Sequence, residues 1–260
     1  MGKEVENHGT PSRLPNLATR ERIIVALDCP AEQARALARQ LKDEACWLKV
    51  GMTLYYATGP QIVGELRELG FRVFVDLKLH DIPHQVRGAA ASIVRAGADM
   101  LTVHALGGTA MLKAAGEGVR EAAEGLSLAT QPTLLAITVL TSMDDASLQQ
   151  VGIAHDPLHE VIVLTELAHE AGCDGVVCSP REAQYIRASW GPEAAIVTPG
   201  VRPAGADRGD QSRVATPSEA LRAGASHLVI GRPITAAADP RSAFEEIVRS
   251  INESDRDTDE

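Results

Sequence analysis

Between residues 74 and 84 the chain reads Phe-Val-Asp-Leu-Lys-Leu-His-Asp-Ile-Pro-His, a strand-like run that contains three charged side chains. Successive side chains of a strand point to opposite faces, so the apolar side chains from Val75 to Leu79 share one face. Phe74, Asp76 and Lys78 share the other face. An antiparallel strand with one face in water would explain this alternation, and the run alone does not exclude it.

The remaining strand-like runs favour a parallel sheet, because they are apolar on both faces. Eight short runs, this one included, recur at residues 23–27, 47–50, 73–79, 100–105, 133–140, 175–178, 195–198 and 227–230. Between them lie stretches with helical spacing, as at residues 31–42, 61–69, 86–96, 109–124, 158–171 and 218–223. This alternation predicts a single-domain α/β fold, a closed (β/α)8 TIM barrel. An open doubly wound sheet is the main alternative, but the sequence has no glycine-rich phosphate turn after its first strand.

Composition and charge restrict the class of protein. The 260 residues are 45% hydrophobic but only 3% aromatic, which suits a core of Ala, Val, Leu and Ile in one large domain. A net charge of −10 argues against nucleic acid or an anionic membrane as a partner. Four cysteines without a C-x-x-C pair indicate reduced thiols and a cytoplasmic protein. The sequence contains no apolar segment of the length that crosses a bilayer or directs secretion.

The two ends of the chain differ in composition from the region between them. Residues 1–20 are expected to be a flexible N-terminal segment, and residues 21–251 are expected to form the barrel. Residues 252–260 are polar and mostly acidic, so they are expected to be a disordered tail.

In a barrel of this kind, the carboxyl ends of the strands open into one mouth, where ligands bind. Polar residues at the ends of the predicted strands are therefore candidate site residues. They are Asp28, Lys49, Asp76, Lys78, Asp81, His104, Thr141, Ser142, Ser179, Arg202 and Arg232. Any one of them could be an ordinary hydrogen-bonded residue at a strand end, but their recurrence on most strands favours a shared site.

The most informative of these residues form a predicted charge array. Asp76 and Lys78 are two residues apart on the inward face, and Asp81 follows where the chain turns into the next helix. Lys49 arrives from the neighbouring strand. Two carboxylates beside Lys78 favour its charged form against the cost of burial. Such an array can stabilise a carbanion and then protonate it.

The loops after the seventh and eighth strands predict a phosphate site, since phosphate often binds between these two loops in such barrels. They contain Pro199-Gly200-Val201-Arg202 and Gly231-Arg232-Pro233. Gly231 would let backbone N–H groups approach closely, and arginine offers a fork that matches phosphate oxygens. Either arginine alone could instead form a surface salt bridge. The long polar segment 204–216 has the composition of a lid over a bound ligand.

Histidine pairs give weaker signals. His80 and His84 are four residues apart, but Pro83 interrupts the helix that would align them on a metal. His155 and His159 have the same spacing without an evident third ligand. Met143-Asp144-Asp145 is interpreted as a loop and helix start. No metal site is predicted.

The motifs at these strand ends resemble the orotidine 5′-phosphate decarboxylase family. The resemblance rests on D-x-K-x-x-D-I-P at residues 76–83, A-L-D at 26–28, L-K-V-G at 48–51, L-T-S at 140–142, T-P-G-V-R at 198–202 and I-G-R-P-I at 230–234. It extends from about residue 22 to residue 250 and implies a (β/α)8 barrel. It also implies conversion of orotidine 5′-monophosphate (OMP) to UMP and CO2 in pyrimidine biosynthesis, without metal or organic cofactor. The implied enzyme is a homodimer with sites at its subunit interface.

The resemblance also implies a role for each site residue. Lys78 would deliver a proton to C6, Asp76 would lie beside the departing carboxylate, and Lys49 would complete the array and bind ribose. Asp81 would reach in from the partner subunit. The other implied substrate contacts are Asp28, Ile82 and Gln85, Thr141 and Ser142 at the pyrimidine, Gln211 of the lid, and Pro199, Arg202, Gly231 and Arg232 toward the phosphate. Gln85 stands where the family commonly has threonine, which puts the geometry of that ribose contact in question.

Two alternatives remain open from the sequence. Sugar-phosphate decarboxylases or aldolases that use Mg²⁺ share this barrel, the D-x-K-x-x-D motif and a Gly-Arg phosphate site, whereas L-T-S and the lid with Gln211 favour a nucleotide. A catalytically silent barrel that senses a phosphorylated metabolite is the other alternative. The presence of both Lys78 and Asp76 argues against it.

Overall fold

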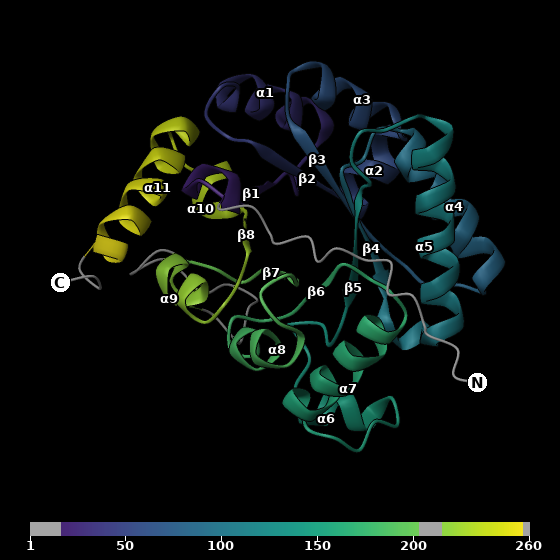
Figure 1. The fold of residues 1–260 in the computed structure, drawn as a ribbon. Helices are drawn as coiled ribbons and strands as arrows, with labels where there is room; N and C mark the ends of the chain where they lie inside the picture. The colour runs from purple at the N-terminus through teal and green to yellow at the C-terminus, as the bar shows by residue number, and fades with distance from the viewer. Residues whose placement is uncertain (1–16, 203–214, 257–260) are drawn as a thin grey trace, which may run out of the picture.

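Eight parallel strands close into a barrel in the computed structural model, which describes residues 17–202 and 215–256 (Figure 1). The strands are β1 (Ile23–Ala26), β2 (Trp47–Gly51), β3 (Arg72–Leu79), β4 (Met100–His104), β5 (Thr133–Ile137), β6 (Gly175–Val177), β7 (Ala195–Thr198) and β8 (His227–Ile230). Each strand pairs with the next in sequence, and β8 pairs with β1. The predicted (β/α)8 barrel is therefore confirmed.

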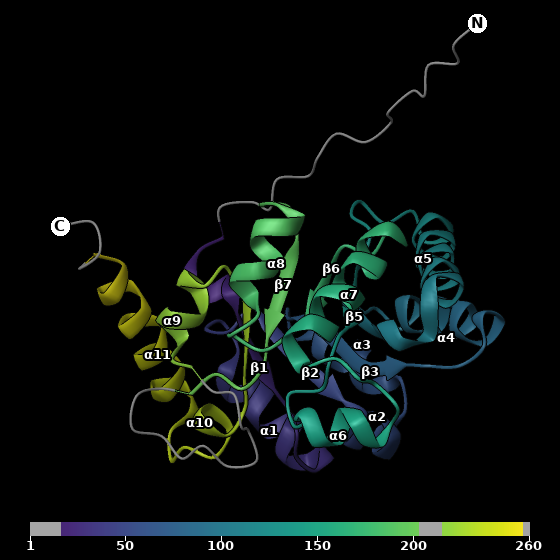
Figure 2. The same cartoon turned by 90° about the horizontal axis from the view of Figure 1, so that it is seen from below.

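Helices surround the strands (Figure 1). They are α1 (Ala31–Leu41), α2 (Met52–Thr58), α3 (Gln61–Glu68), α4 (Pro83–Arg95), α5 (Gly108–Gly125), α6 (Asp145–Gln150), α7 (Pro157–Glu170), α8 (Ala183–Trp190), α9 (Pro217–Arg222), α10 (Arg232–Thr235) and α11 (Pro240–Arg256), with 3₁₀ turns η1 (Thr19–Arg22) and η2 (Ala105–Gly107). The six helical stretches predicted from spacing correspond to α1, α3, α4, α5, α7 and α9. Figure 2 shows α2, α6 and α10 together at one end of the barrel, and α2 and α10 directly follow β2 and β8. That end is therefore the mouth.

The strands are buried on both faces, as expected for a parallel sheet covered by helices. Every residue of β1, β2, β7 and β8 is buried. Inward side chains such as Ile24, Trp47, Phe74, Met100 and Leu135 fill the barrel, and a larger apolar layer joins the outer strand faces to the helices. The interior below the mouth is thus a packed core.

Strand β3 departs from this regularity near its end. Val75 lies opposite Leu101 and Leu79 opposite Val103, so four residues of β3 span two residues of β4. Within this bulge Lys78 has a φ of 53°, in the left-handed region that costs a residue with a Cβ about 1–2 kcal/mol. Bulges of this kind re-aim side chains next to functional sites. Simple alternation placed Asp76 and Lys78 on one face but could not reveal the bulge.

Helical structure crosses both predicted segment boundaries. Thr19 and Arg20 belong to η1, before the predicted start of the barrel at residue 21, and α11 continues to Arg256, beyond its predicted end at residue 251. The Thr19 hydroxyl donates a hydrogen bond to the Asn252 side chain, which joins the two ends. Residues 1–16 and 257–260 lie outside the described part of the chain. The helices that the structure describes are all too short or too polar to cross a membrane.

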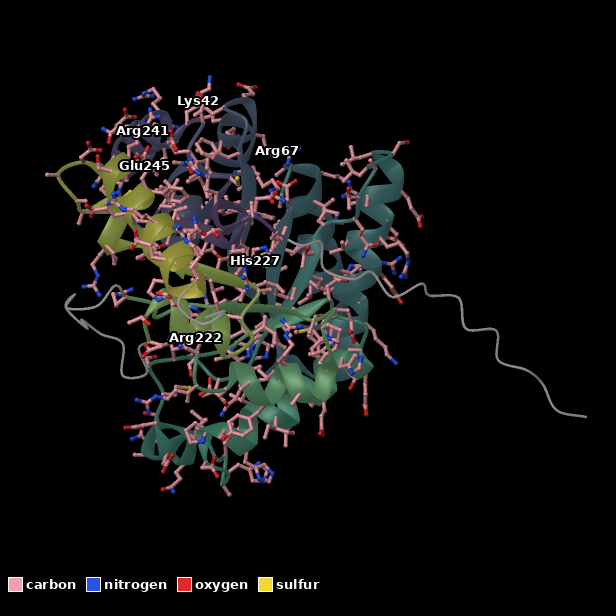
Figure 3. All side chains as sticks on the ribbon, turned by 60° about the vertical axis from the view of Figure 1, so that its left-hand side comes forward. Lys42, Arg67, Arg222, His227, Arg241 and Glu245 are labelled. Carbon is pink, nitrogen blue, oxygen red and sulfur yellow. The ribbon has the colours of Figure 1, made fainter. Side chains whose placement is uncertain are left out.

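His227 is a buried titratable group inside the barrel (Figure 3). Its ring meets the edge of Trp47 at 6.0 Å, and Ser226 Oγ lies 3.0 Å from its Nδ1. Burial, followed by the charges of Arg72 and Arg22, lowers the pKa of His227 from 6.5 to about 4. Between pH 4 and pH 6.5, His227 is therefore neutral in the folded protein but protonated in the unfolded chain.

We expect His227 to make the fold sensitive to mild acid. Its contribution to stability is complete above pH 6.5 and is lost as the pH falls toward 4, by about 2–3 kcal/mol at pH 4.5. The free energy of unfolding of the unmodified protein and of His227→Phe is measured in urea at pH 8.0 and pH 4.5. This variant is chosen because phenylalanine keeps an aromatic ring but cannot titrate. The variant should lose less stability than the unmodified protein between the two pH values. An identical loss in both proteins would contradict the assignment.

Candidate active site

A cavity of about 660 Å³ opens at the carboxyl ends of the strands. Predicted site residues that line it are Asp28, Lys49, Asp76, Lys78, Thr141, Pro199, Arg202, Gly231 and Arg232. They come from the ends of β1, β2, β3, β7 and β8 and from the loop after β5. The structure thus brings together residues that are up to about 200 positions apart in the sequence, as the mouth of a barrel does.

Alternating charges occupy one side of this cavity. Lys49 Nζ lies 3.0 Å from Asp28 Oδ1 and 3.6 Å from Asp76 Oδ2. Lys78 Nζ lies 2.9 Å from Asp76 Oδ1. Burial alone would raise the pKa of Asp76, but the two ammonium groups and two hydrogen bonds outweigh it and hold that pKa below its usual value. Asp76 is therefore a carboxylate between two cations.

The members of the array differ in their access to water. The side chains of Lys49 and Asp76 are 7% and 13% exposed, Lys78 is 29% exposed, and Asp28 is 64% exposed. Charges interact most strongly where water is excluded, so the pair of Asp76 with Lys49 forms the inner part of the array. Lys78 lies at the boundary, where its ammonium group can meet a ligand.

Thr102 on β4 is a site residue that the sequence interpretation missed. It is fully buried, its hydroxyl lies 3.0 Å from Asp76 Oδ1, and it accepts a hydrogen bond from the Lys78 backbone N–H at 2.9 Å. The only signal in the sequence that could have identified Thr102 was its position two residues before His104, which puts both side chains on the same face of the strand. A threonine in a strand is otherwise unremarkable, because β-branched residues favour strands.

Gly51, the last residue of β2, was quoted in a motif but not proposed for the site. A Cβ at this position would lie 2.9 Å from Asp28 Oδ1 and 3.1 Å from Lys49 Nζ. Such contacts would force those side chains to move, so glycine leaves room for the pair of Asp28 with Lys49. The apolar floor of the cavity, formed by Ala26, Phe74, Val177 and Val229, was also not predicted.

The opposite side of the cavity contains the predicted phosphate-binding residues. Pro199, Gly200 and Arg202 after β7 line the cavity together with Gly231 and Arg232 after the neighbouring strand β8. Arg202 N donates to Ala215 O at 3.0 Å, which joins the two described residues that flank segment 203–214. That segment, with Gln211 and most of the predicted lid, lies outside the described residues. Two arginines in one cavity provide the chemistry for binding a phosphate.

Four predicted site residues do not line the cavity. Asp81, Ile82 and Gln85 are exposed where β3 leads into α4, and Ser142 is exposed beside Thr141. Asp81 Oδ1 accepts a hydrogen bond from Ile82 N at 2.6 Å. These residues lie close in sequence to residues that do line the cavity. Their participation in the site remains a prediction.

Two further candidates from strand ends also stand apart from the cavity. The ring of His104 stacks on His80 at 5.3 Å, and burial, with smaller effects of His80 and Lys78, lowers the pKa of His104 to about 4. Ser179 is buried, and its backbone N–H donates to Glu182 Oε2 at 2.7 Å. His104 accepts a hydrogen bond from Leu106 N and fits the structural alternative that the sequence left open. The buried Ser179 hydroxyl has no hydrogen-bond partner among the described residues, so Ser179 fits neither that alternative nor the cavity lining.

The weaker motifs behave as ordinary structural features. Asp144 accepts a hydrogen bond from Ser147 N at 2.9 Å and caps α6, which confirms the predicted helix start. The rings of His155 and His159 lie 4.1 Å apart, and His155 contacts Glu160. Among residues 17–202 and 215–256, no group of three or more metal-ligating side chains comes together.

Comparisons with known proteins agree with this arrangement. Residues 21–247 match the profile described as the orotidine 5′-phosphate decarboxylase / HUMPS family. A curated orotidine 5′-phosphate decarboxylase of Moorella thermoacetica is 54% identical over 89% of this chain and 92% of its own length. One from Nitrosococcus oceani is 50% identical over 90% and 98%. The crystal structure of the Lactobacillus acidophilus orotidine 5′-phosphate decarboxylase superposes with a TM-score of 0.79 and 37% identity, covering 89% of this chain and 99% of that one.

Proposed function

This chain belongs to the orotidine 5′-phosphate decarboxylase / HUMPS family, and we propose that the charged mouth of its barrel is the active site, with Lys78 as the proton donor. The protein is an enzyme that decarboxylates OMP to UMP and CO2 in pyrimidine biosynthesis. The observation that carries the site assignment is Lys78 Nζ at 2.9 Å from Asp76, in a cavity whose other side contains Arg202 and Arg232.

The geometry supports a direct route from OMP to UMP. With the phosphate at Arg202, Gly231 and Arg232, the base extends toward Asp76 and Lys78. The bond between C6 and the carboxylate carbon breaks, CO2 leaves, and the electron pair stays at C6. Lys78 Nζ then gives its proton to C6, and water returns a proton to the amine.

Preorganised charge accounts for the acceleration. Negative charge that starts on the substrate carboxylate moves to C6 in the transition state, beside the Lys78 ammonium group. Asp76, which also pairs with Lys49, holds that group in place before the reaction, so little reorganisation is required when charge develops. Binding of the remote phosphate supplies free energy that the reacting ring alone cannot. Asp28, which accepts a hydrogen bond from Lys49, binds ribose hydroxyls in this proposal.

We further propose a homodimer with shared sites. Asp81, Ile82 and Gln85 are exposed next to the mouth, which suits residues that complete the site of a second copy. In this proposal Gln85 makes the ribose contact for which the family commonly has threonine. In the same proposal Thr141 and Ser142 contact the pyrimidine, and Gln211, which lies outside the described residues, bridges the base and the phosphate. Four free thiols and a metabolic activity support a cytoplasmic location.

The alternatives are less favoured than OMP decarboxylation. The curated relatives with the greatest identity here are named orotidine 5′-phosphate decarboxylases, rather than enzymes of sugar phosphates. A silent sensor has no need for the proton donor Lys78 or for its carboxylate partner Asp76. Turnover of OMP by protein treated with EDTA separates the three functions, because only a decarboxylase that works without Mg²⁺ remains active.

We expect Arg232→Ala to impair OMP far more than its phosphate-free nucleoside. Loss of charged hydrogen bonds to the phosphate should lower kcat/KM for OMP by about 10- to 100-fold. The value for orotidine should change by less than about threefold, since no phosphate contact is lost. The assay follows the absorbance of the base in EDTA. Arg222→Ala on α9 (Figure 3) is the matched control and should leave both substrates unaffected. Equal losses for the two substrates would show that Arg232 does not bind phosphate.

A further inference from the structure

The backbone of Lys78, in the bulge of β3, is hydrogen-bonded to a side chain of β4. Where the register of β3 shifts against β4, the Lys78 N–H donates to Thr102 Oγ1 at 2.9 Å. The same residue has the left-handed φ of 53°. A conformation of this kind persists only where the surroundings hold it in place. Thr102 is fully buried, so water does not compete for its hydroxyl.

The direction of the Thr102 hydroxyl follows from its two partners. Its oxygen accepts from the Lys78 N–H, which leaves the single hydroxyl proton for Asp76 Oδ1 at 3.0 Å. Asp76 is ionised between Lys49 and Lys78 and can only accept. One hydroxyl therefore connects the backbone of the proton donor to the carboxylate that pairs with its ammonium group.

These contacts fix the orientation of the carboxylate. Asp76 Oδ1 receives the Thr102 hydroxyl and Lys78 Nζ, while Oδ2 faces Lys49 Nζ at 3.6 Å. Without the Thr102 hydroxyl, the Lys78 N–H loses this hydrogen bond. Asp76 Oδ1 then keeps only its contact with the flexible Lys78 ammonium group. The Asp76 carboxylate could then rotate, and the β3 backbone could relax toward a regular strand that aims Lys78 elsewhere.

We propose that Thr102 is a positioning residue for decarboxylation, which acts by holding Asp76 and the backbone of Lys78 in the geometry that aims the Lys78 ammonium group at the substrate. This inference rests on the proposal that Lys78 and Asp76 carry the reaction. Thr102 lies below the array and does not line the cavity, so it acts through these two residues rather than on the substrate.

The test compares Thr102→Val, which keeps the branched shape, with Thr102→Ser, which keeps the hydroxyl. A small misalignment of a reacting group costs about 100-fold in rate, so kcat of Thr102→Val should fall by about that factor. KM for OMP and the affinity for UMP should change by less than about threefold, because the phosphate contacts are intact. Thr102→Ser should restore kcat to within about fivefold of the unmodified enzyme.

A buried threonine outside the site provides the matched control. Thr138 is fully buried just after β5, and its hydroxyl donates to Val177 O at 2.9 Å. Thr138→Val should lower stability to unfolding without changing kcat. If Thr102→Val does not fold, the pair Thr102→Ala and Thr102→Ser gives the same comparison. The outcomes that overturn the role of Thr102 are an unchanged kcat in the variants that lack the hydroxyl, or no rescue by a folded Thr102→Ser.

The double variant of Lys78→Ala with Thr102→Val separates the proposed role of Thr102 from the proposed active site. In Lys78→Ala, where no donor remains to be aimed, adding Thr102→Val should cause no further loss of rate. If Lys78→Ala keeps its activity, the proposed active site fails. If Lys78→Ala is inactive while Thr102→Val is fully active, only the role of Thr102 fails.

Discussion

Lys78→Ala should lower the rate of OMP decarboxylation by about 10⁴-fold or more, because it removes both the proton donor and a cation beside the developing charge. The affinity for UMP should stay within about threefold, since the phosphate contacts bind product and substrate alike. The rate is measured from the absorbance change of OMP in EDTA, and UMP binding by calorimetry. The two measurements together separate chemistry from binding.

The control for this variant is a lysine outside the site. Lys42→Ala, at the end of α1 (Figure 3), removes the same charge from an exposed position and should leave kcat unchanged. The fold of Lys78→Ala should also be preserved, because alanine accepts the local backbone as readily as lysine does. Decarboxylation by Lys78→Ala within about tenfold of the unmodified enzyme would exclude Lys78 as the donor.

The sequence predicted the architecture because the period of the pattern is a local property. Strand β1 is apolar on both faces, as expected for a parallel sheet covered by helices. The helices that spacing did not reveal include α2, α6 and α10, which are short and close to the mouth. Helix α11 extends past residue 252 because its apolar face, with Phe244, Ile247 and Ile251, is buried against the barrel. A polar composition at its end did not prevent the helix from continuing for another turn.

The candidate site was predicted wherever a charged residue ended a strand, as with Asp76 and Arg232. It was missed where the contribution depends on pairing between strands. The bulge that gives Lys78 its left-handed backbone arises from the fit of β3 against β4, and neither strand contains a local signal for it. Thr102 and Gly51 act through a hydroxyl and through the absence of a side chain, both of which occur in ordinary strands. A charged residue at the end of a strand can be recognised in the sequence as a site candidate, whereas the neutral residues that position it cannot.

Asp81 requires a different explanation, because it is exposed in a single chain. Its side chain contacts only its own turn in the described structure, through Ile82 N. Among the described residues, none from α4 of the same chain lines the cavity that contains Lys78. If a second copy supplies Asp81, each complete site draws Lys78 from one chain and Asp81 from the other. Two inactive variants then carry complementary defects.

Mixing these variants should restore activity. When Lys78→Ala and Asp81→Ala are unfolded together and reassembled, each heterodimer has one site with both residues and one site with neither. Random pairing makes about half of the dimers mixed, so recovery should approach about a quarter of the unmodified activity, as two-fold symmetry requires. Activity per site and the fraction of heterodimer by native mass spectrometry are the measurements.

A matched mixture tests the logic of the complementation. Lys78→Ala with Asp76→Ala should show no recovery, because both residues belong to the array of one chain and every site in that heterodimer lacks one of them. Recovery in the Asp81 mixture alone therefore identifies Asp81 as the residue that crosses the interface. If Asp81 acts within its own chain, its mixture behaves as the Asp76 mixture does. An activity no greater than the sum of the two variants, with heterodimers present, would then refute the shared site while leaving the role of Lys78 intact.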